Sequence, residues 1–195
     1  MNKRIKFVNI LSAILCVILI APIFIVVIVS FGKSSYMIFP PSSFSTKWYL
    51  DFFSSPDWMG SLVTSLIIGL VSSLIATTLG FLGAYSLVRG TYRNKKLLIS
   101  FCLLPLIFPS IITAVALYFA SVPLDLVASK LWIAICHAAL SIPVVLLILI
   151  SSLQGVDQSI ERAAYGLGAS KFYTFTRIVI PLAAPGILSA AFFSF

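Results

Sequence analysis

Five long stretches of the chain contain no charged residue, and they constrain its fold more than any other feature. They are residues 7–32, 58–88, 97–124, 131–156 and 178–195. A helix needs about 20 mainly apolar residues to cross the hydrocarbon core of a bilayer, and the first four stretches are longer than that. Only 9% of the residues are charged, whereas about 25% is usual in a soluble domain. The sequence therefore predicts an all-α polytopic membrane protein.

A single transmembrane domain is expected over residues 1–195. Its helices are expected at about 7–31, 61–88, 97–120, 131–153 and 182–195, with an external segment over 32–60 and a cytoplasmic loop over 154–181. The first apolar stretch is about twice as long as the 7–15 residues of a signal peptide, which predicts a retained helix. The ten residues after Pro185 rise only about 15 Å as a helix, half of the hydrocarbon core. We therefore expect the fifth helix to be truncated, as in a fragment or a shortened reading frame.

The basic residues are distributed unevenly between the loops that join these helices. Ten fall on one side of the membrane: Lys3, Arg4, Lys6, Arg89, Arg93, Lys95, Lys96, Arg162, Lys171 and Arg177. Three fall on the other: Lys33, Lys47 and Lys130. Because Lys and Arg accumulate in cytoplasmic loops, the N-terminus and the loops at 89–96 and 154–181 are predicted to face the cytoplasm. This distribution excludes the single basic face of a nucleic-acid-binding protein.

Few polar features lie inside the expected spans. Small residues recur on one helical face: Ser65, Gly69, Ser73, Ala76, Gly80 and Ala84. Close helix packing is favoured for this face over contact with a solute, although the two are compatible. His137 is the one ionisable group within a span, and it is either a functional group or, more often, a hydrogen-bonded structural one. Pro105, Pro109 and Pro143 indicate kinks, which serve a cavity or packing alone.

Signals of catalysis, of a metal site and of nucleotide binding are missing from the sequence. Cys16, Cys102 and Cys136 stand alone in apolar runs, as structural cysteines do. The tripeptide GKS at 32–34 lacks the earlier glycine of a phosphate loop, where Val27 stands instead. The carboxylates all fall in loops. The chain is therefore predicted to be no enzyme and to need no cofactor and no metal.

The cytoplasmic loop has the pattern of two short helices joined by a glycine bend. Asp157 and Ser170 are suitable N-caps for the two helices. The first helix is expected to present an apolar stripe of Ile160, Ala163, Ala164 and Leu167, and to end at Gly166 and Gly168. The second is expected to present Phe172, Phe175, Thr176 and Val179 and to stop at Pro181. The two alanines favour insertion into a protein groove over binding to a lipid surface.

Residues 161–187, ERAAYGLGASKFYTFTRIVIPLAAPGI, resemble the EAA loop of binding-protein-dependent ABC importer permeases with the MetI-like transmembrane domain. The resemblance implies three partners in addition to the lipid bilayer of a prokaryotic cell membrane. They are an ABC ATPase subunit, a second permease subunit (identical or different) and an extracytoplasmic substrate-binding protein. It implies that the ATPase docks on Glu161, Ala163, Ala164, Gly168 and Ala169. The usual glutamate of the motif is replaced by Arg162, and Glu161 lies one position earlier, about 100° around the helix.

Four further segments are similar to the polyamine branch of this family. They are FSTKWY at 44–49, GAYSLVRG at 83–90, LPLIFPSIITAVAL at 104–117 and HAALSIPVVLLI at 137–148. The resemblance implies ATP-driven uptake of spermidine, putrescine or a related small solute, and it leaves the residues that contact the solute unknown. The alternative is a secondary transporter without an ATPase. That alternative needs an intramembrane charge or cation site, for which the sequence offers only His137.

Overall fold

The computed structural model describes residues 3–195, with side chains described from Val8 onwards. The side chains of Lys3, Arg4 and Lys6, which carry the N-terminal part of the charge argument, lie outside the described residues. The chain consists of two compact units, Met1–Leu62 and Val63–Phe195. The regular elements of the described residues are helices.

The first unit is built around α1 (Lys3–Ser30) and α2 (Lys47–Ser54). The indole N–H of Trp48 donates to the carbonyl of Gly32 at 3.0 Å. The ring of Tyr49 stacks on Phe31 with centroids 5.1 Å apart, and its hydroxyl lies 2.6 Å from Ser30 Oγ. These contacts hold α2 against the end of α1. The sequence predicted an external segment here and missed this helix, because these partners of α2 come from residues 16 or more positions away.

The small-residue face of α3 (Pro56–Arg89) packs closely in the second unit. Ser73, Ala76, Gly80 and Ala84 are buried. A Cβ added at Gly80 would lie 2.5 Å from Cγ1 of Val145 on α6 (Lys130–Gln154), closer than van der Waals contact allows. Small residues let helix backbones approach in this way. The close packing predicted for this face is therefore confirmed for its part from Ser73 to Ala84.

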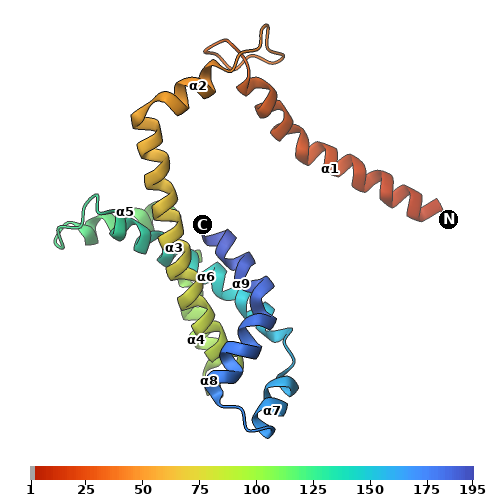
Figure 1. Ribbon diagram of the computed structural model, residues 1–195, viewed down its shortest axis with the longest axis vertical. Coiled ribbons are helices and arrows are strands. Elements are labelled where there is room, and N and C mark those ends of the chain that lie inside the picture. The colour runs from red at the N-terminus through yellow and green to blue at the C-terminus, as the bar shows by residue number, and fades with distance from the viewer. Residues whose placement is uncertain (1–2) are drawn as a thin grey trace. The chain divides into compact units, whose positions relative to one another are not determined.

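Helix α6 also packs along α9 (Ile180–Ser194), and the two run side by side in Figure 1. The core between α3, α6 and α9 is apolar and uses many alanines. Its buried members are Ala76, Phe81, Ala84, Leu87, Ala138, Val145, Leu146, Leu149, Leu153, Val179, Ala183 and Ala190.

The segment expected as one helix over 97–120 is bent sharply. It consists of α4 (Lys95–Leu103), the 3-10 turn η1 (Leu104–Leu106) and α5 (Ser110–Ser121), and the two helical parts meet at 89°. Pro105 and Pro109 explain the break, since proline lacks a backbone donor and disfavours a helical conformation in the preceding residue.

Pro181, in contrast, does not end a helix. α8 (Lys171–Thr174), the π-helical turn η2 (Phe175–Val179) and α9 follow one another without a break, and Pro181 lies in the first turn of α9. The prediction that Pro181 stops the helix is therefore wrong. Proline is compatible with the first turn of a helix, where an N–H needs no intrahelical partner, and the π-helical turn η2 precedes it.

Among the described residues, four helices are long and apolar enough to cross a membrane. They are Val8–Ser30, Pro56–Arg89, Lys130–Gln154 and Lys171–Ser194, and the bent pair α4–α5 would make a fifth if it counts as one span. The prediction of an all-α polytopic membrane protein is confirmed.

Candidate functional site

The segment between α6 and α9 begins with a capped helix, α7 (Gln158–Gly166). Oδ1 of Asp157 accepts a hydrogen bond from the backbone N–H of Ser159 at 2.8 Å, which confirms Asp157 as the N-cap. The pKa of Asp157 is held below its usual value of 3.8. The main cause is this hydrogen bond from the Ser159 amide, followed by a hydrogen bond from the Ser159 side chain and by the positive charge of Arg162. The carboxylate therefore stays ionised at the positive end of the helix dipole.

The other end of α7 closes with a glycine in the left-handed conformation. Gly168 has φ +86°. Its N–H donates to the carbonyl of Tyr165 at 3.0 Å, and the N–H of Ala169 donates to Ala164 at 3.0 Å. These two bonds form a Schellman motif, in which glycine avoids the penalty that a Cβ brings. Gly168 is thus required by the backbone of the bend, whereas Gly166 still belongs to the helix.

The bend leads directly into α8. Oγ of Ser170 accepts from the N–H of Tyr173 at 3.2 Å, so the predicted second cap is confirmed. The chain therefore forms the helix, bend and helix that its sequence predicts, with α7 at one end of the second unit in Figure 1.

One face of α7 is exposed although it is apolar. It consists of Ile160, Ala163 and Leu167, and we call it the outer face. Leu167 is 90% exposed and Ile160 43%. The predicted stripe is thus divided, because its fourth member, Ala164, is buried. The outer face lies outside the candidate spans and is a candidate contact surface for a partner.

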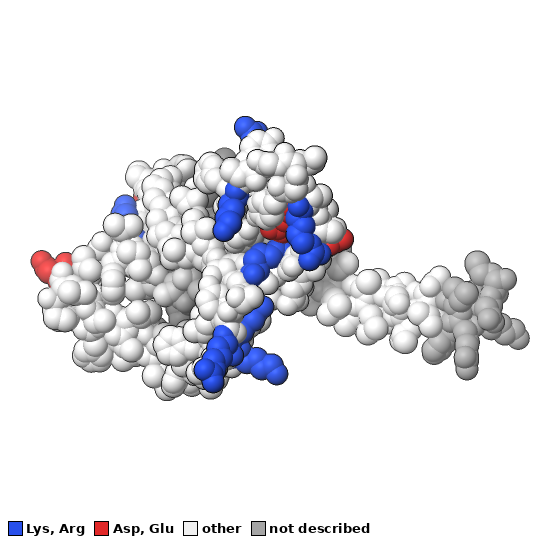
Figure 2. Space-filling model, turned by 90° about the horizontal axis from the view of Figure 1, so that it is seen from below, with Lys and Arg blue, Asp and Glu red and all other residues white. Residues whose placement is uncertain are grey.

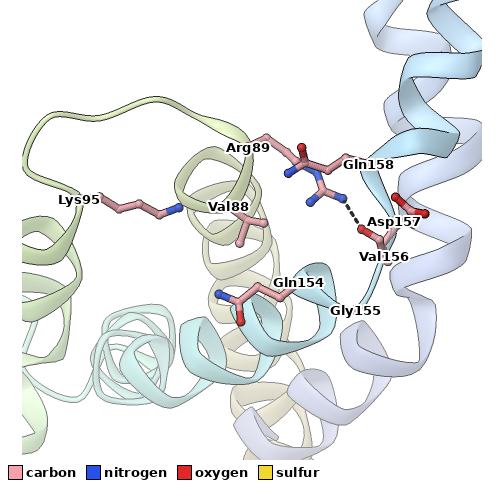
Figure 3. A pocket seen from close by; sticks show the side chains of 8 residues that line it. All are labelled: Val88, Arg89, Lys95, Gln154, Gly155, Val156, Asp157 and Gln158. Atoms are coloured by element: carbon pink, nitrogen blue, oxygen red, sulfur yellow. Dashed lines mark hydrogen bonds between the residues drawn. The ribbon is translucent and has the colours of Figure 1, made fainter.

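The opposite face of α7 carries a buried ion pair. Nη2 and Nε of Arg89, at the end of α3, each lie 2.7 Å from Oε1 of Glu161. The Arg89 and Glu161 side chains are 12% and 7% exposed. Nη2 of Arg89 also donates to the carbonyl of Val156 at 3.0 Å, as Figure 3 shows. Glu161 therefore points into the protein, while its neighbour Arg162 is exposed.

The five residues predicted to dock an ATPase have different environments. Ala163 and Gly168 are exposed, Ala169 is half-buried, and Ala164 and Glu161 are buried. The sequence analysis did not identify Arg89 as a partner of this loop. The only feature of the sequence that distinguishes Arg89 is that it is the charged residue directly after the second apolar stretch.

Basic side chains surround this segment. Figure 2 views the end of the second unit that carries α7, and Lys and Arg side chains gather there. A groove of about 560 Å³ lies between the end of α3 and the start of α7, and Lys95, Arg89, Gln154 and Gln158 are among the residues that line it (Figure 3). The groove is polar and open.

A second polar feature is a cavity of about 400 Å³ between α3, α6 and α9. Its lining includes Ser65, Gly69, Ser72, His137, Ser141, Phe193 and Ser194. Oγ of Ser72 is buried and has no hydrogen-bond partner. The walls combine hydroxyls, one imidazole and aromatic rings, and no carboxylate lines them. Such a surface can hydrogen-bond to a small polar molecule.

Within the described residues, no group of three or more His, Cys, Asp or Glu is placed to hold a metal ion. Cys16, Cys102 and Cys136 are free thiols.

Comparison with known proteins places the chain, including this loop, in a family. The family described as "Binding-protein-dependent transport system inner membrane component" matches residues 76–195, which is more than half of the chain. The match includes α7, the Gly168 bend and α9.

Individual relatives are similar over most of the chain. The spermidine/putrescine transport system permease protein PotC of Haemophilus influenzae is 29% identical over 174 residues, covering 89% of this chain and 67% of the relative. The trehalose transport system permease protein SugB of Mycobacterium tuberculosis is 29% identical over 155 residues, covering 80% and 57%. The putrescine transport system permease protein PotI of Escherichia coli is 31% identical over 186 residues, covering 91% and 65%. The chain thus spans between 57% and 67% of the length of these relatives.

Proposed function

The chain belongs to the family of binding-protein-dependent transport system inner membrane components, and on that premise we propose that it is the permease subunit of an ATP-driven uptake system. The observation that carries the proposal is the outer face of α7, an apolar surface held outside the spans by a glycine-terminated bend.

In this proposal the outer face of α7 inserts into a cleft on a separate ABC ATPase subunit. The small side chain of Ala163 permits close approach, and Leu167 supplies the exposed apolar contact. Gly168 and Ala169 set the direction in which the chain leaves the cleft. Ala164 and Glu161 contribute from inside the loop, because their side chains face α3 and its neighbours.

The remaining partners follow from the family. A second permease subunit, identical or different, completes the pathway, and an extracytoplasmic binding protein delivers the solute. The loop and the N-terminus face the cytoplasm of a prokaryotic cell, where the basic residues of the loops at 89–96 and 154–181 agree with the positive-inside rule. ATP hydrolysis belongs to the partner and not to this chain.

The proposed cargo is a polyamine or a related small polar solute. PotC and PotI, whose names give spermidine and putrescine, support a polyamine. SugB, whose name gives trehalose, is equally similar and makes a disaccharide the second candidate. The cavity that contains Ser72 and His137 suits both, since hydroxyl oxygens can accept from ammonium groups as well as from sugar hydroxyls.

The experiment that tests the proposal compares energy sources in proteoliposomes. The chain is reconstituted with the ATPase and second permease that co-purify with it, and uptake of labelled putrescine and labelled trehalose is measured with the binding protein. We expect uptake that requires ATP and persists without an ion gradient. Uptake that continues on an ion gradient after ATP is depleted would instead identify a secondary transporter and contradict the proposal.

A further inference from the structure

We infer that Arg89 and Glu161 form an internal anchor through which movement of α7 is transmitted to the membrane helix α3. This inference rests on the proposed function, since it assigns to two residues the positioning of the docking helix. It differs from the expectation that Glu161 itself contacts the ATPase.

The first argument is the number and geometry of the contacts. The guanidinium of Arg89 uses Nε and Nη2 for Glu161, both at 2.7 Å, and Nη2 also for the carbonyl of Val156 at 3.0 Å. The hydroxyl of Tyr85 donates to the other carboxylate oxygen at 3.5 Å. Arg89 therefore holds α7 at Glu161 and the turn before α7 at Val156. A planar guanidinium fixes its partners in direction as well as in distance.

The second argument is the orientation of α7. Neighbouring residues on a helix point about 100° apart. Glu161 points into the protein, and Arg162 points to solvent. The charge that α7 presents beside its outer face is thus positive, and the carboxylate is already occupied by Arg89. The ATPase cleft that fits this surface is expected to be apolar with an acidic residue opposite Arg162.

The third argument is that α3 holds both sides of the bend. The ring of Phe175 on η2 packs edge-on against Tyr85 with centroids 4.9 Å apart, and it lies 5.7 Å from Phe81. At Gly80, the residue before Phe81, α3 is in close contact with α6. A displacement of α7 by a partner therefore reaches α3 through Arg89, and the close packing at Gly80 passes it on to α6.

The test uses variants that change the anchor but keep the outer face. Glu161→Gln keeps the shape of the side chain and removes its charge. Arg89→Lys keeps the positive charge and removes the planar guanidinium that binds two partners at once. Arg93→Gln is the matched control, since Arg93 is an exposed cation in the neighbouring loop. Each variant is reconstituted with the ATPase, second permease and binding protein, and labelled putrescine or trehalose uptake is measured per ATP hydrolysed.

We expect both anchor variants to retain the ATPase while uptake per ATP falls about tenfold, as the loss of one hydrogen bond to a charged group implies. The control should stay at the wild-type ratio. An unchanged ratio of uptake to ATP hydrolysis in Glu161→Gln would overturn the inference. It would show that the anchor only stabilises the fold and does not transmit movement of α7.

A second measurement needs no ATPase. Hydrogen exchange of the isolated chain in detergent should be faster over residues 158–166 in Glu161→Gln and unchanged there in Arg93→Gln. Equal exchange in all three proteins would contradict the anchor. If the wild-type chain binds no ATPase, the proposed function fails, and the exchange comparison still decides whether Arg89 holds α7.

Discussion

The two helices on either side of Gly168 are attached to α3 in different ways. α7 is held by polar contacts, chiefly between Arg89 and Glu161. The second arm, α8 with η2, is held by aromatic packing of Phe175 and by direct continuation into α9. Both arms begin with a side-chain cap and are similarly short. They differ in the contacts that attach them to α3.

This difference indicates which arm can move. The ion pair holds α7 through a few directional contacts at one residue, so α7 can turn about Arg89 while it remains attached to α3. Aromatic contacts and an unbroken helix resist such a change. We therefore expect α7 to be the arm that responds to a partner and α8 to be the fixed arm.

The largest effect is expected from Gly168→Trp. The position has φ +86°, where a side chain is strained, and an indole there would project beside the outer face. The variant should lose the co-purified ATPase and yet insert into the membrane as the wild type does. Affinity purification from membranes measures both, and retention of the ATPase at the wild-type ratio would show that α7 does not need this bend for docking.

The second arm should be sensitive to loss of its ring. Phe175→Ala removes a half-buried side chain from between Phe81 and Tyr85 and should lower the free energy of unfolding by about 2 kcal/mol. Phe172→Ala is the matched control, since Phe172 is 77% exposed. Unfolding in a denaturing detergent compares them, and equal losses would contradict the aromatic attachment.

Gly168 in the bend and Gly166 at the end of α7 provide a test with a smaller expected effect. Neither Gly166 nor Gly168 has an atom within 4 Å of an added Cβ, and only Gly168 has a positive φ. Gly168→Ala should cost about 1 kcal/mol of stability, whereas Gly166→Ala should add about 0.5 kcal/mol as a better helix former. Equal effects on thermal stability would refute the Schellman bend.

The smallest effect concerns the cap of α7. The folded-state pKa of Asp157 is lowered from 3.8, so the cap contributes fully above that pH and is lost as the pH falls through the lowered value. Asp157→Asn should therefore reduce the pH dependence of hydrogen exchange at 158–161 in acid and leave it unchanged near neutrality. A pH dependence identical to that of the wild type would show that another group controls the start of α7.

Local chemistry explains what the sequence predicted well. The presence of several long apolar helices follows from charge-free length, and the caps at Asp157 and Ser170 and the bend at Gly168 follow from the conformational preferences of those residues. The inner face of α3 follows from its helical period. Each of these features depends on residues within a few positions of one another.

The missed features depend on residues far apart in the chain. Pro109 lies at a break between helices, whereas Pro181 lies in the first turn of α9. The inward orientation of Glu161 depends on where Arg89 lies, 72 residues earlier. Helix α2 depends on contacts to the end of α1. No local preference encodes these arrangements.

The measurement that most directly tests the account is site-specific crosslinking from α7. Ala163→Cys, made in a chain whose Cys16, Cys102 and Cys136 are replaced by Ser, places one thiol on the outer face. Arg93→Cys, in the neighbouring loop and also exposed, is the control. The account predicts a covalent adduct between Cys at 163 and the co-purifying ATPase, and a much weaker one at 93. No adduct at 163, or equal adducts at both positions, would contradict docking through α7.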